Sequence, residues 1–336
     1  MIRVVFMGSA DLSAVMLERL AREEGVQIVG CVTQPDKPAG RGKKPAPCAC
    51  KAFVDRVGIP CLTPEKINTP ESLARIAAWL PDVIVVVAYG QFLSKRLLEI
   101  PMLGCVNIHL SLLPRHRGAS PIHAALLAGD RISGVTAMLM DEGMDSGPVL
   151  MTAETPILSS DTCETLHDRL ADLGAELLVK VLPLWAYFKV KPMPQDPTHV
   201  TIAYKIKKLD GLLHWEMPTD CILRKIRAYA LWPSSFTYFP EGHKDTGKML
   251  KVLIAEPERV TAAQAKACPG TVLCVEKMGI VVRTGDGAIR LLRIQPEGGK
   301  PMDIPSYLCG HSLHSGLVFF TPPAPEAKPP QAFKRT

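Results

Sequence analysis

Several features that define common protein classes are missing from this chain. Its ten cysteines form no Cys-x-x-Cys pair, and Cys48 and Cys50 are too close together for a usual zinc site. No apolar run reaches the roughly 18 residues of a membrane-spanning helix, and the one near the first residue is too short for a secretory signal. We therefore expect a soluble cytoplasmic protein with free thiols, no bound metal and no membrane contact.

The glycine spacings of nucleotide-binding loops are also missing. Gly8 follows the first predicted strand without the Gly-x-Gly-x-x-Gly pattern, so a dinucleotide site is not expected. The segment 40–44 (Gly-Arg-Gly-Lys-Lys) carries three cations but lacks the spacing of a phosphate-binding loop. By itself this segment indicates a flexible, solvated basic loop.

The charge is unevenly distributed over a chain long enough for two domains. Of the 336 residues, 47% are hydrophobic, which is ample for a sizeable core. Residues 1–200 hold 20 Lys and Arg against 21 Asp and Glu, whereas residues 201–336 hold 19 against 12. The net charge of +7 on the second part indicates either a module that binds a polyanion or a basic excess that only keeps the protein soluble.

The first 190 residues alternate short apolar runs with helical patterns, as in an α/β protein. The alternation predicts a Rossmann-like fold, with a mostly parallel sheet and helices on both faces. Predicted strands cover 4–7, 28–32, 83–88 and 106–109; predicted helices cover 14–23, 73–80 and 122–127; a hairpin joins 135–140 to 149–155. A long helix from 162 to 188 should begin at Asp161 as N-cap, with Glu164 completing a capping box.

The second half has a different pattern. A catalytic domain is expected over 1–189, a proline-containing linker over 190–203, a second domain over 204–315 and a flexible, proline-rich tail over 316–336. After a helix at 220–230, short predicted strands cover 235–239, 249–255, 270–275, 280–283 and 288–294. Strands at this spacing predict a smaller OB-like β-barrel.

The strand that ends near residue 109 carries the candidate chemistry. Residues two apart in a strand point to the same side, so the amide of Asn107 and the imidazole of His109 are aimed together. Ligands of open α/β sheets bind at the carboxyl ends of strands, and such a pair can stabilise charge on an oxygen during acyl transfer. Alone, Asn-x-His is more often an ordinary strand end.

The flanking residues carry a family resemblance. The segments 86–90 (Val-Val-Ala-Tyr-Gly), 107–122 (from Asn-Ile-His to Ser-Pro-Ile) and 140–147 (Met-Asp-Glu-Gly-Met-Asp-Ser-Gly) resemble the folate-dependent formyltransferases. That superfamily includes enzymes acting on glycinamide ribonucleotide, aminosugars and methionyl-tRNA. The segment 34–44 (from Gln-Pro-Asp to Lys-Lys) resembles the methionyl-tRNA branch, and the likeness runs from about residue 2 to about residue 310.

The resemblance implies a function and a set of site residues. The expected reaction moves the formyl group of 10-formyltetrahydrofolate to methionyl initiator tRNA, with Asn107, His109 and Asp145 as the catalytic set and Asp141 as the rival carboxylate. Implied folate contacts are Ser111, Leu112, Leu113, Pro114, Ala88, Tyr89, Gly90, Met138, Leu139, Met140 and Asp141. Implied tRNA contacts are Arg41, Lys43, Lys44, Lys205, Lys207, Lys208, Arg224 and Arg227, with Arg41 as the key side chain of a basic finger.

Two other functions remain open from the sequence, and departures from the family pattern affect only details. The acceptor can be an aminosugar nucleotide, or the chain can be a non-catalytic RNA-binding protein; a monomer is expected in each case. Leu110 stands where a glycine is common after the catalytic histidine, and His214 precedes Trp215 where an acidic residue is usual. These changes affect contacts within the pocket and the second domain, and leave the expected fold unchanged.

Overall fold

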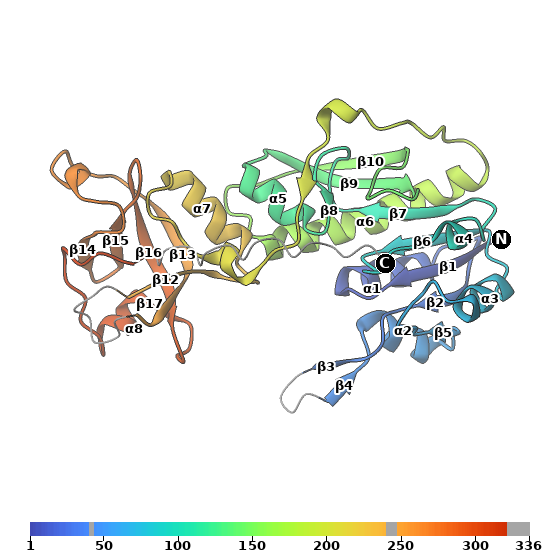
Figure 1. The fold of residues 1–336 in the computed structure, drawn as a ribbon, viewed down its shortest axis with the longest axis horizontal. Helices are drawn as coiled ribbons and strands as arrows, with labels where there is room; N and C mark the ends of the chain where they lie inside the picture. Colours follow the sequence, from blue (N-terminus) through green and yellow to red (C-terminus); the bar gives the residue numbers. More distant parts are fainter. Residues whose placement is uncertain (40–43, 240–246, 321–336) are drawn as a thin grey trace, which may run out of the picture. The chain divides into compact units, whose positions relative to one another are not determined.

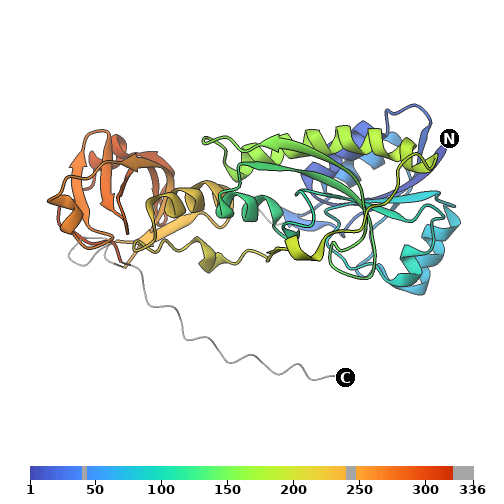
Figure 2. The same cartoon turned by 90° about the horizontal axis from the view of Figure 1, so that it is seen from above.

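The computed structural model describes residues 1–39, 44–239 and 247–320, and the chain divides into two compact units (Figures 1 and 2). The first unit is Met1–Ile206 and the second is Lys207–Thr336. The candidate catalytic residues all belong to the first unit.

The first unit is built on a seven-stranded sheet in the order β10-β9-β7-β6-β1-β2-β5. The strands are β1 (Ile2–Gly8), β2 (Val26–Val32), β5 (Cys61–Leu62), β6 (Val83–Val87), β7 (Cys105–His109), β9 (Ile132–Leu139) and β10 (Val149–Pro156). Pairs are parallel except that β9 runs antiparallel to both β7 and β10. The Rossmann-like, mostly parallel sheet predicted from the sequence is confirmed.

Helices cover both faces of this sheet (Figure 1). On one face α6 (Cys163–Ala186) packs beside α1 (Asp11–Leu20); the Cβ of an alanine at Gly174 would meet both Met16 of α1 and Ile108 of β7. On the other face, α3 (Pro70–Ala78) and α4 (Lys95–Leu98) join the core through Ile76 and Leu97. The remaining helices are α2 (Ala49–Val57) and α5 (Pro121–Ala128).

The start of α6 differs from the expectation. The N-cap is Thr162, whose hydroxyl accepts from the N–H of Thr165 in a reciprocal capping box, and Glu164 has no part in it. Asp161 instead lies buried beneath the helix start, where it accepts from Arg169, from the N–H of Leu158 and from Thr165. The prediction failed because a threonine next to the aspartate could close the same cap.

The segment 190–203, which the sequence predicts to be a linker, is instead part of the first unit. Met193 forms a β-bridge with Val149, and β11 (Ile202–Ala203) pairs in parallel with β8 (Arg117–Gly118). A short 3-10 turn, η1 (Pro197–His199), lies between these two contacts. The prolines suppress regular structure along most of the segment. Backbone N–H and C=O groups elsewhere in it pair with β10 and β8.

The second unit is a small antiparallel β structure. Its strands are β12 (Ser235–Tyr238), β13 (Met249–Glu258), β14 (Val272–Glu276), β15 (Gly279–Arg283), β16 (Ala288–Pro296) and β17 (Met302–Asp303), in the order β12-β13-β16-β15-β14 with β17 beside β16. The helices α7 (Thr219–Ala228) and α8 (Ile304–Leu308) contribute Ile222 and Ile304 to its core.

Residues beyond 315 close the sheet of the second unit into a barrel. Phe320 forms a β-bridge with Tyr238 at the end of β12, and Val318 forms one with Thr271 just before β14, so this segment joins the two edge strands. Phe319 is buried and stacks on Trp215 at 5.7 Å between ring centroids. The expected tail at 316–336 therefore begins too early: residues 316–320 belong to the barrel, and 321–336 lie outside the described residues. The sequence did not predict a strand at the Val-Phe-Phe run because five prolines and a basic end follow it.

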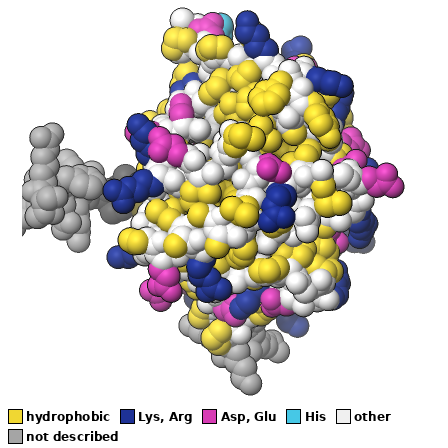
Figure 3. Space-filling view, turned by 90° about the vertical axis from the view of Figure 1, so that its right-hand side faces the viewer, with side chains coloured by type: hydrophobic (Ala, Val, Ile, Leu, Met, Phe, Trp, Pro, Cys, Tyr) yellow, Lys and Arg dark blue, Asp and Glu magenta, His cyan; other side chains and the backbone are white. Residues whose placement is uncertain are grey.

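The face seen in Figure 3 mixes charges of both signs with apolar side chains. No helix in the described parts of the chain has the length and apolarity needed to cross a bilayer. All ten cysteines are free, and burial raises the pKa values of the Cys50, Cys105 and Cys163 thiols to about 12. These three are protonated, unreactive core residues at neutral pH.

Candidate active site

The order of the strands creates a switch point between β1 and β6. From β1 the chain continues through β2 and β5 to one side of the sheet, and then through β6 and β7 to the other. At such a point the connections leave the carboxyl ends of two neighbouring strands in opposite directions, which opens a crevice for a ligand. The hydroxyl of Ser13 donates to the carbonyl of Val87 at 2.7 Å across this point, which ties the start of α1 to the end of β6.

Asn107 and His109 point to the face covered by α3 and α4. Cys105, two residues before Asn107, belongs to the core of that face, and alternation along β7 places Asn107 and His109 on the same side. Both are buried, at 9% and 7% exposed. They therefore continue the core row toward the carboxyl end of β7, where loops rather than helices surround them.

Both ring nitrogens of His109 face oxygen atoms. Nε2 lies 2.9 Å from the carbonyl oxygen of His116. A carbonyl oxygen only accepts, so Nε2 carries the hydrogen in the neutral and in the charged ring alike. The other ring nitrogen, Nδ1, lies 3.6 Å from Oδ2 of Asp145.

The carboxylate of Asp145 joins the two β7 side chains to a neighbouring loop. Its Oδ1 lies 3.5 Å from Nδ2 of Asn107, and its Oδ2 accepts from the N–H of Gly118 at 2.7 Å. Asp145 is 18% exposed, so its attraction for a protonated His109 is screened less than on an open surface. The structure thus brings Asn107, His109 and Asp145 together.

The rival carboxylate, Asp141, has a structural role. Its Oδ1 accepts from the N–H of Gly143 at 3.0 Å and from the hydroxyl of Ser146 at 2.7 Å. These contacts close the turn that precedes Asp145, as aspartate side chains commonly do in turns. The loop therefore uses one carboxylate to hold its shape and places the other beside His109.

The predicted folate segment 111–114 is folded tightly against the sheet. The hydroxyl of Ser111 donates to the carbonyl of Arg115 at 2.6 Å, and the N–H of Leu113 donates to Thr136 at 3.1 Å. Leu113 is buried, while Leu112 and Pro114 are half-buried. Hence Leu112 and Pro114 have partly exposed side chains, whereas Ser111 and Leu113 are buried.

The other predicted folate residues differ in what they expose. Ala88 and Gly90 are exposed and have φ of +44° and +79°, while the Tyr89 side chain is buried in the core. The carbonyl of Tyr89 accepts from the Gln34 amide at 2.7 Å. In the second predicted group, Met138 is buried, Leu139 and Met140 are half-buried and Asp141 is exposed.

The predicted tRNA-contacting cations are only partly described. Arg41 and Lys43 lie outside the described residues, as does the side chain of Lys44 at the start of β4 (Lys44–Ala46), which pairs with β3 (Lys37–Ala39). Lys205, Lys207 and Lys208 are exposed, whereas Arg224 and Arg227 on α7 are half-buried.

Lys225, between the two arginines of α7, is not available for an anion. It is half-buried, its Nζ donates to the carbonyl of Leu212 at 2.6 Å, and burial lowers its pKa. Among the predicted cations whose side chains the structure describes, the three lysines of residues 205–208 are therefore the most exposed.

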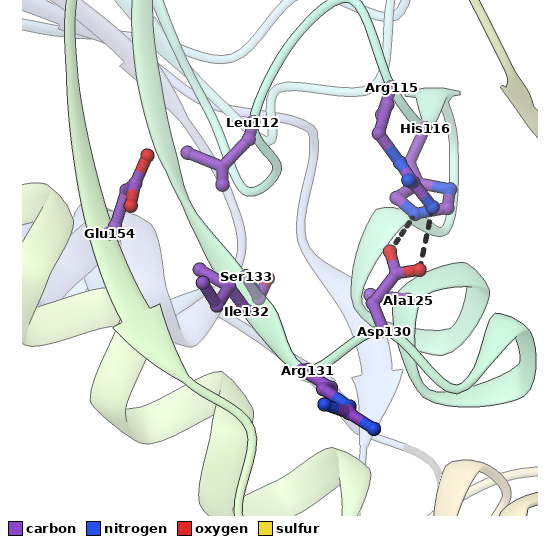
Figure 4. A pocket seen from close by; sticks show the side chains of 9 residues that line it. All are labelled: Leu112, Arg115, His116, Ala125, Asp130, Arg131, Ile132, Ser133 and Glu154. Carbon is purple, nitrogen blue, oxygen red and sulfur yellow. Dashed lines mark hydrogen bonds and ion pairs between the residues drawn. The ribbon is translucent and has the colours of Figure 1, made fainter.

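A cavity of about 320 Å³ lies beside the loop that follows β7 (Figure 4). Asp130 pairs there with Arg115 at 2.6 Å and with Nε2 of His116 at 2.7 Å. The N–H of His116 also donates to Thr201 at 2.8 Å. His116 is thus held at its ring and its backbone, which fixes the carbonyl that receives the Nε2 hydrogen of His109.

Three contributors to the site were not identified in the sequence. His116 and Gly118 lie in the resembling segment but had no assigned role, and Gln195 was placed in the linker. His116 and Gly118 contribute through a backbone carbonyl and a backbone N–H, which carry no side-chain signature. Gln195 contributes through its side-chain amide, whose partners include backbone carbonyl groups of a distant segment. No three or more His, Cys, Asp or Glu side chains in the described parts of the chain are placed to hold a metal ion.

The chain matches two protein-family models in succession. The formyl transferase model matches residues 2–182, and the formyl transferase C-terminal domain model matches residues 205–312. A methionyl-tRNA formyltransferase of Nitrosococcus oceani is 42% identical over 97% of this chain and 98% of that protein. One of Symbiobacterium thermophilum is 41% identical over 98% of both chains.

Solved structures share the fold at lower identity. An N-formyltransferase of Helicobacter canadensis, solved with folinic acid and dTDP-3-aminofucose, matches with a TM-score of 0.61 and 16% identity over 87% of this chain and 99% of that one. HypX of Aquifex aeolicus, solved with tetrahydrofolic acid, matches with a TM-score of 0.57 and 18% identity over 92% of this chain and 47% of that one. With both family models and near-complete relatives in agreement, the chain belongs to the formyl transferase family and, within it, to the methionyl-tRNA formyltransferases.

Proposed function

We propose that this enzyme transfers the formyl group of 10-formyltetrahydrofolate to the α-amino group of methionine on initiator tRNA, with Asn107, His109 and Asp145 as its catalytic residues. The observation that carries the proposal is the meeting of an amide, an imidazole and a carboxylate at the carboxyl end of β7, in a chain of this family. These are the groups that acyl transfer to an amine needs without a metal.

In the proposed reaction the methionine nitrogen forms a bond to the formyl carbon, and the bond from that carbon to N10 of the folate breaks. The tetrahedral intermediate carries charge on the formyl oxygen. Asn107 has a second Nδ2 hydrogen available for that oxygen, and one such donor contributes a factor of about 10²–10³ in rate. The proton lost by the amine ends on the folate nitrogen.

His109 suits the proton transfer because its Nε2 is engaged by the carbonyl of His116, which leaves Nδ1 for exchange with the substrate. Asp145 favours the protonated ring by electrostatic attraction across 3.6 Å, while the carbonyl of His116 holds the ring in place through Nε2. A positioned acid or base of this kind contributes a factor of about 10²–10⁴. The pair therefore both orients the ring and stabilises its charged form during turnover.

For the folate, the exposed backbone of Ala88 and Gly90 and the side chains of Leu112 and Pro114 are the groups best placed to contact a flat ring. The backbone supplies hydrogen-bonding groups, and the side chains supply an apolar wall. Tyr89 contributes through its backbone alone, because its ring lies in the core. Ser111, Leu113 and Met138 to Asp141 support the shape of this pocket in the proposal.

For the tRNA, the net +7 of residues 201–336 and the exposed lysines at 205, 207 and 208 supply positive charge that attracts a polyanion. Arg41, Lys43 and Lys44 form a second basic group in the segment that resembles the family's finger. Positive charges on two segments distant in the chain suit a long polyanion such as a nucleic acid better than a small sugar nucleotide. We further infer that the enzyme is cytoplasmic and acts as a monomer. Light scattering of the purified protein tests the monomeric state.

An acceptor assay tests the proposed function. Purified enzyme is given radiolabelled 10-formyltetrahydrofolate and either methionyl initiator tRNA, methionyl elongator tRNA or a dTDP-aminosugar, at one stated salt concentration. Transfer to the initiator tRNA alone is the expected result. Transfer to the aminosugar alone, or tRNA binding without transfer, would replace the proposal by one of the two rival functions.

A further inference from the structure

Gln195 of the connecting segment contacts the loop that carries Asp145. Its Nε2 donates to two carbonyl oxygens, that of Asp145 at 2.8 Å and that of Gly147 at 2.7 Å. Its Oε1 accepts from Nε and from one terminal nitrogen of Arg117, at 3.0 and 2.8 Å. One half-buried side chain thus makes four hydrogen bonds.

The partners determine which way the amide points. Arg117 only donates, so the atom facing it is the oxygen, and the two carbonyl groups only accept, so the atom facing them is the nitrogen. Both hydrogens of Nε2 and both lone pairs of Oε1 are in use. A glutamate of the same shape keeps the pair with Arg117 and loses both donations, and a methionine keeps only the shape.

The loop that Gln195 holds has a conformation that needs support. Asp145 has φ of +50°, in the left-handed region where a residue with a Cβ is strained. The carbonyl of Asp145 is fixed by Gln195, while its carboxylate is fixed by the N–H of Gly118, next to Arg117. Arg117 and Gly118 form β8. This short strand therefore holds the backbone of Asp145 through Gln195 and its carboxylate through Gly118.

We propose that Gln195 is a positioning residue for the reaction: it holds the backbone of Asp145 so that the carboxylate faces His109 and Asn107. The inference rests on the proposed function of Asp145. Misplacement of a catalytic group by about 1 Å can cost about 100-fold in rate. Loss of the two donations should therefore lower kcat about 10- to 100-fold and leave both KM values nearly unchanged.

The test compares Gln195→Glu and Gln195→Met with the wild type, alone and in combination with Asp145→Asn. Asp196→Ala is the matched control, because Asp196 is exposed, adjacent, and contacts Thr198 and His199 of the η1 turn rather than the Asp145 loop. The measurements are kcat, both KM values and the thermal unfolding midpoint. Gln195→Glu retains the anchor to Arg117, so it stays informative even where Gln195→Met unfolds.

The expected result is a loss of kcat in both Gln195 variants, with no further loss when Asp145 is already asparagine, because the residue acts through that carboxylate. Wild-type kcat in Gln195→Glu, or an equal loss with and without the Asp145 carboxylate, would overturn the inference. An Asp145→Asn enzyme with normal turnover would instead overturn the assignment of Asp145 in the proposed function, which keeps the two failures distinguishable.

Discussion

Nδ1 of His109 faces Oδ2 of Asp145 across 3.6 Å, a distance too long for a hydrogen bond and short enough for strong attraction once the ring is protonated. Nδ2 of Asn107 is similarly loose against Oδ1 of the same carboxylate, at 3.5 Å. Catalytic contacts often tighten only when substrate is bound. The carboxylate is held firmly at Gly118 and loosely at the two side chains that we propose act on the substrate.

Removal of the imidazole should abolish most of the turnover. We expect His109→Ala to lower kcat by about 10²–10⁴, because the proton acceptor and donor is lost. Asn107→Ala should lower it by about 10²–10³ through the loss of one donor to the oxyanion. His167→Ala, which removes an α6 histidine that pairs only with its neighbour Asp168 in the described contacts, should leave turnover unchanged. Steady-state formyl transfer checks all three, and near-normal activity of His109→Ala contradicts the mechanism.

Gly118 cannot accept a side chain without displacing the N–H that holds Asp145. A Cβ at this position would lie 2.6 Å from the carbonyl oxygen of Ala203, and φ there is +116°. Gly118→Ala should therefore lower both kcat and the unfolding midpoint, because β8 and β11 must separate. Gly58→Ala is the control: it has φ of +76° but open space around it, so it should cost about 1 kcal/mol of stability and no activity. Full activity of Gly118→Ala would show that its N–H is not needed.

The basic finger should affect the acceptor and not the donor. Arg41 lies outside the described residues, and its role rests on the family resemblance. We expect Arg41→Ala to raise the KM for methionyl-tRNA, with the KM for folate unchanged, because an arginine fork contacts phosphates or base edges. The measurement is made at two salt concentrations, since tRNA binding weakens with salt. The exposed Arg22, which pairs with Glu18, provides the control as Arg22→Ala. An unchanged tRNA KM would rule out the finger.

Asp161 should make the stability of the first unit depend on acid pH. Burial favours the neutral carboxyl, but hydrogen bonds from Arg169, Leu158 and Thr165 outweigh it and lower the pKa of Asp161. A lowered pKa in the folded state contributes stability above the unfolded value of 3.8, and that stability is lost as the pH falls through the folded value.

Asp161→Asn should therefore lower the free energy of unfolding by about 2 kcal/mol at pH 7, with a smaller difference at pH 3. Urea unfolding at the two pH values measures this effect. Asp168→Asn, exposed on the same helix, should change stability by less than about 0.5 kcal/mol at either pH. A constant difference across the pH range would exclude the ionised carboxyl as its source.

The predicted strands and helices of the first unit and the five main strands of the second were found because their apolar periodicity is strong and local. The predicted N-cap of α6 was wrong because Asp161 and Thr162 are both good N-cap residues. Only the contact of Asp161 with Arg169 decides between them. The strand near residue 318 was missed because it pairs with two distant strand ends rather than with a sequence neighbour.

The sequence by itself determined the alternating α/β pattern, the basic second half, and the placement of Asn107 and His109 on one side of a strand, because these depend on period and composition. Only the tertiary structure decided that Asp145 meets His109 while Asp141 closes the turn, that Nε2 of His109 faces the carbonyl of His116, and that Gln195 reaches the loop. Such choices depend on contacts between segments distant in the chain, and on carbonyl and N–H groups that every residue carries and no sequence pattern distinguishes.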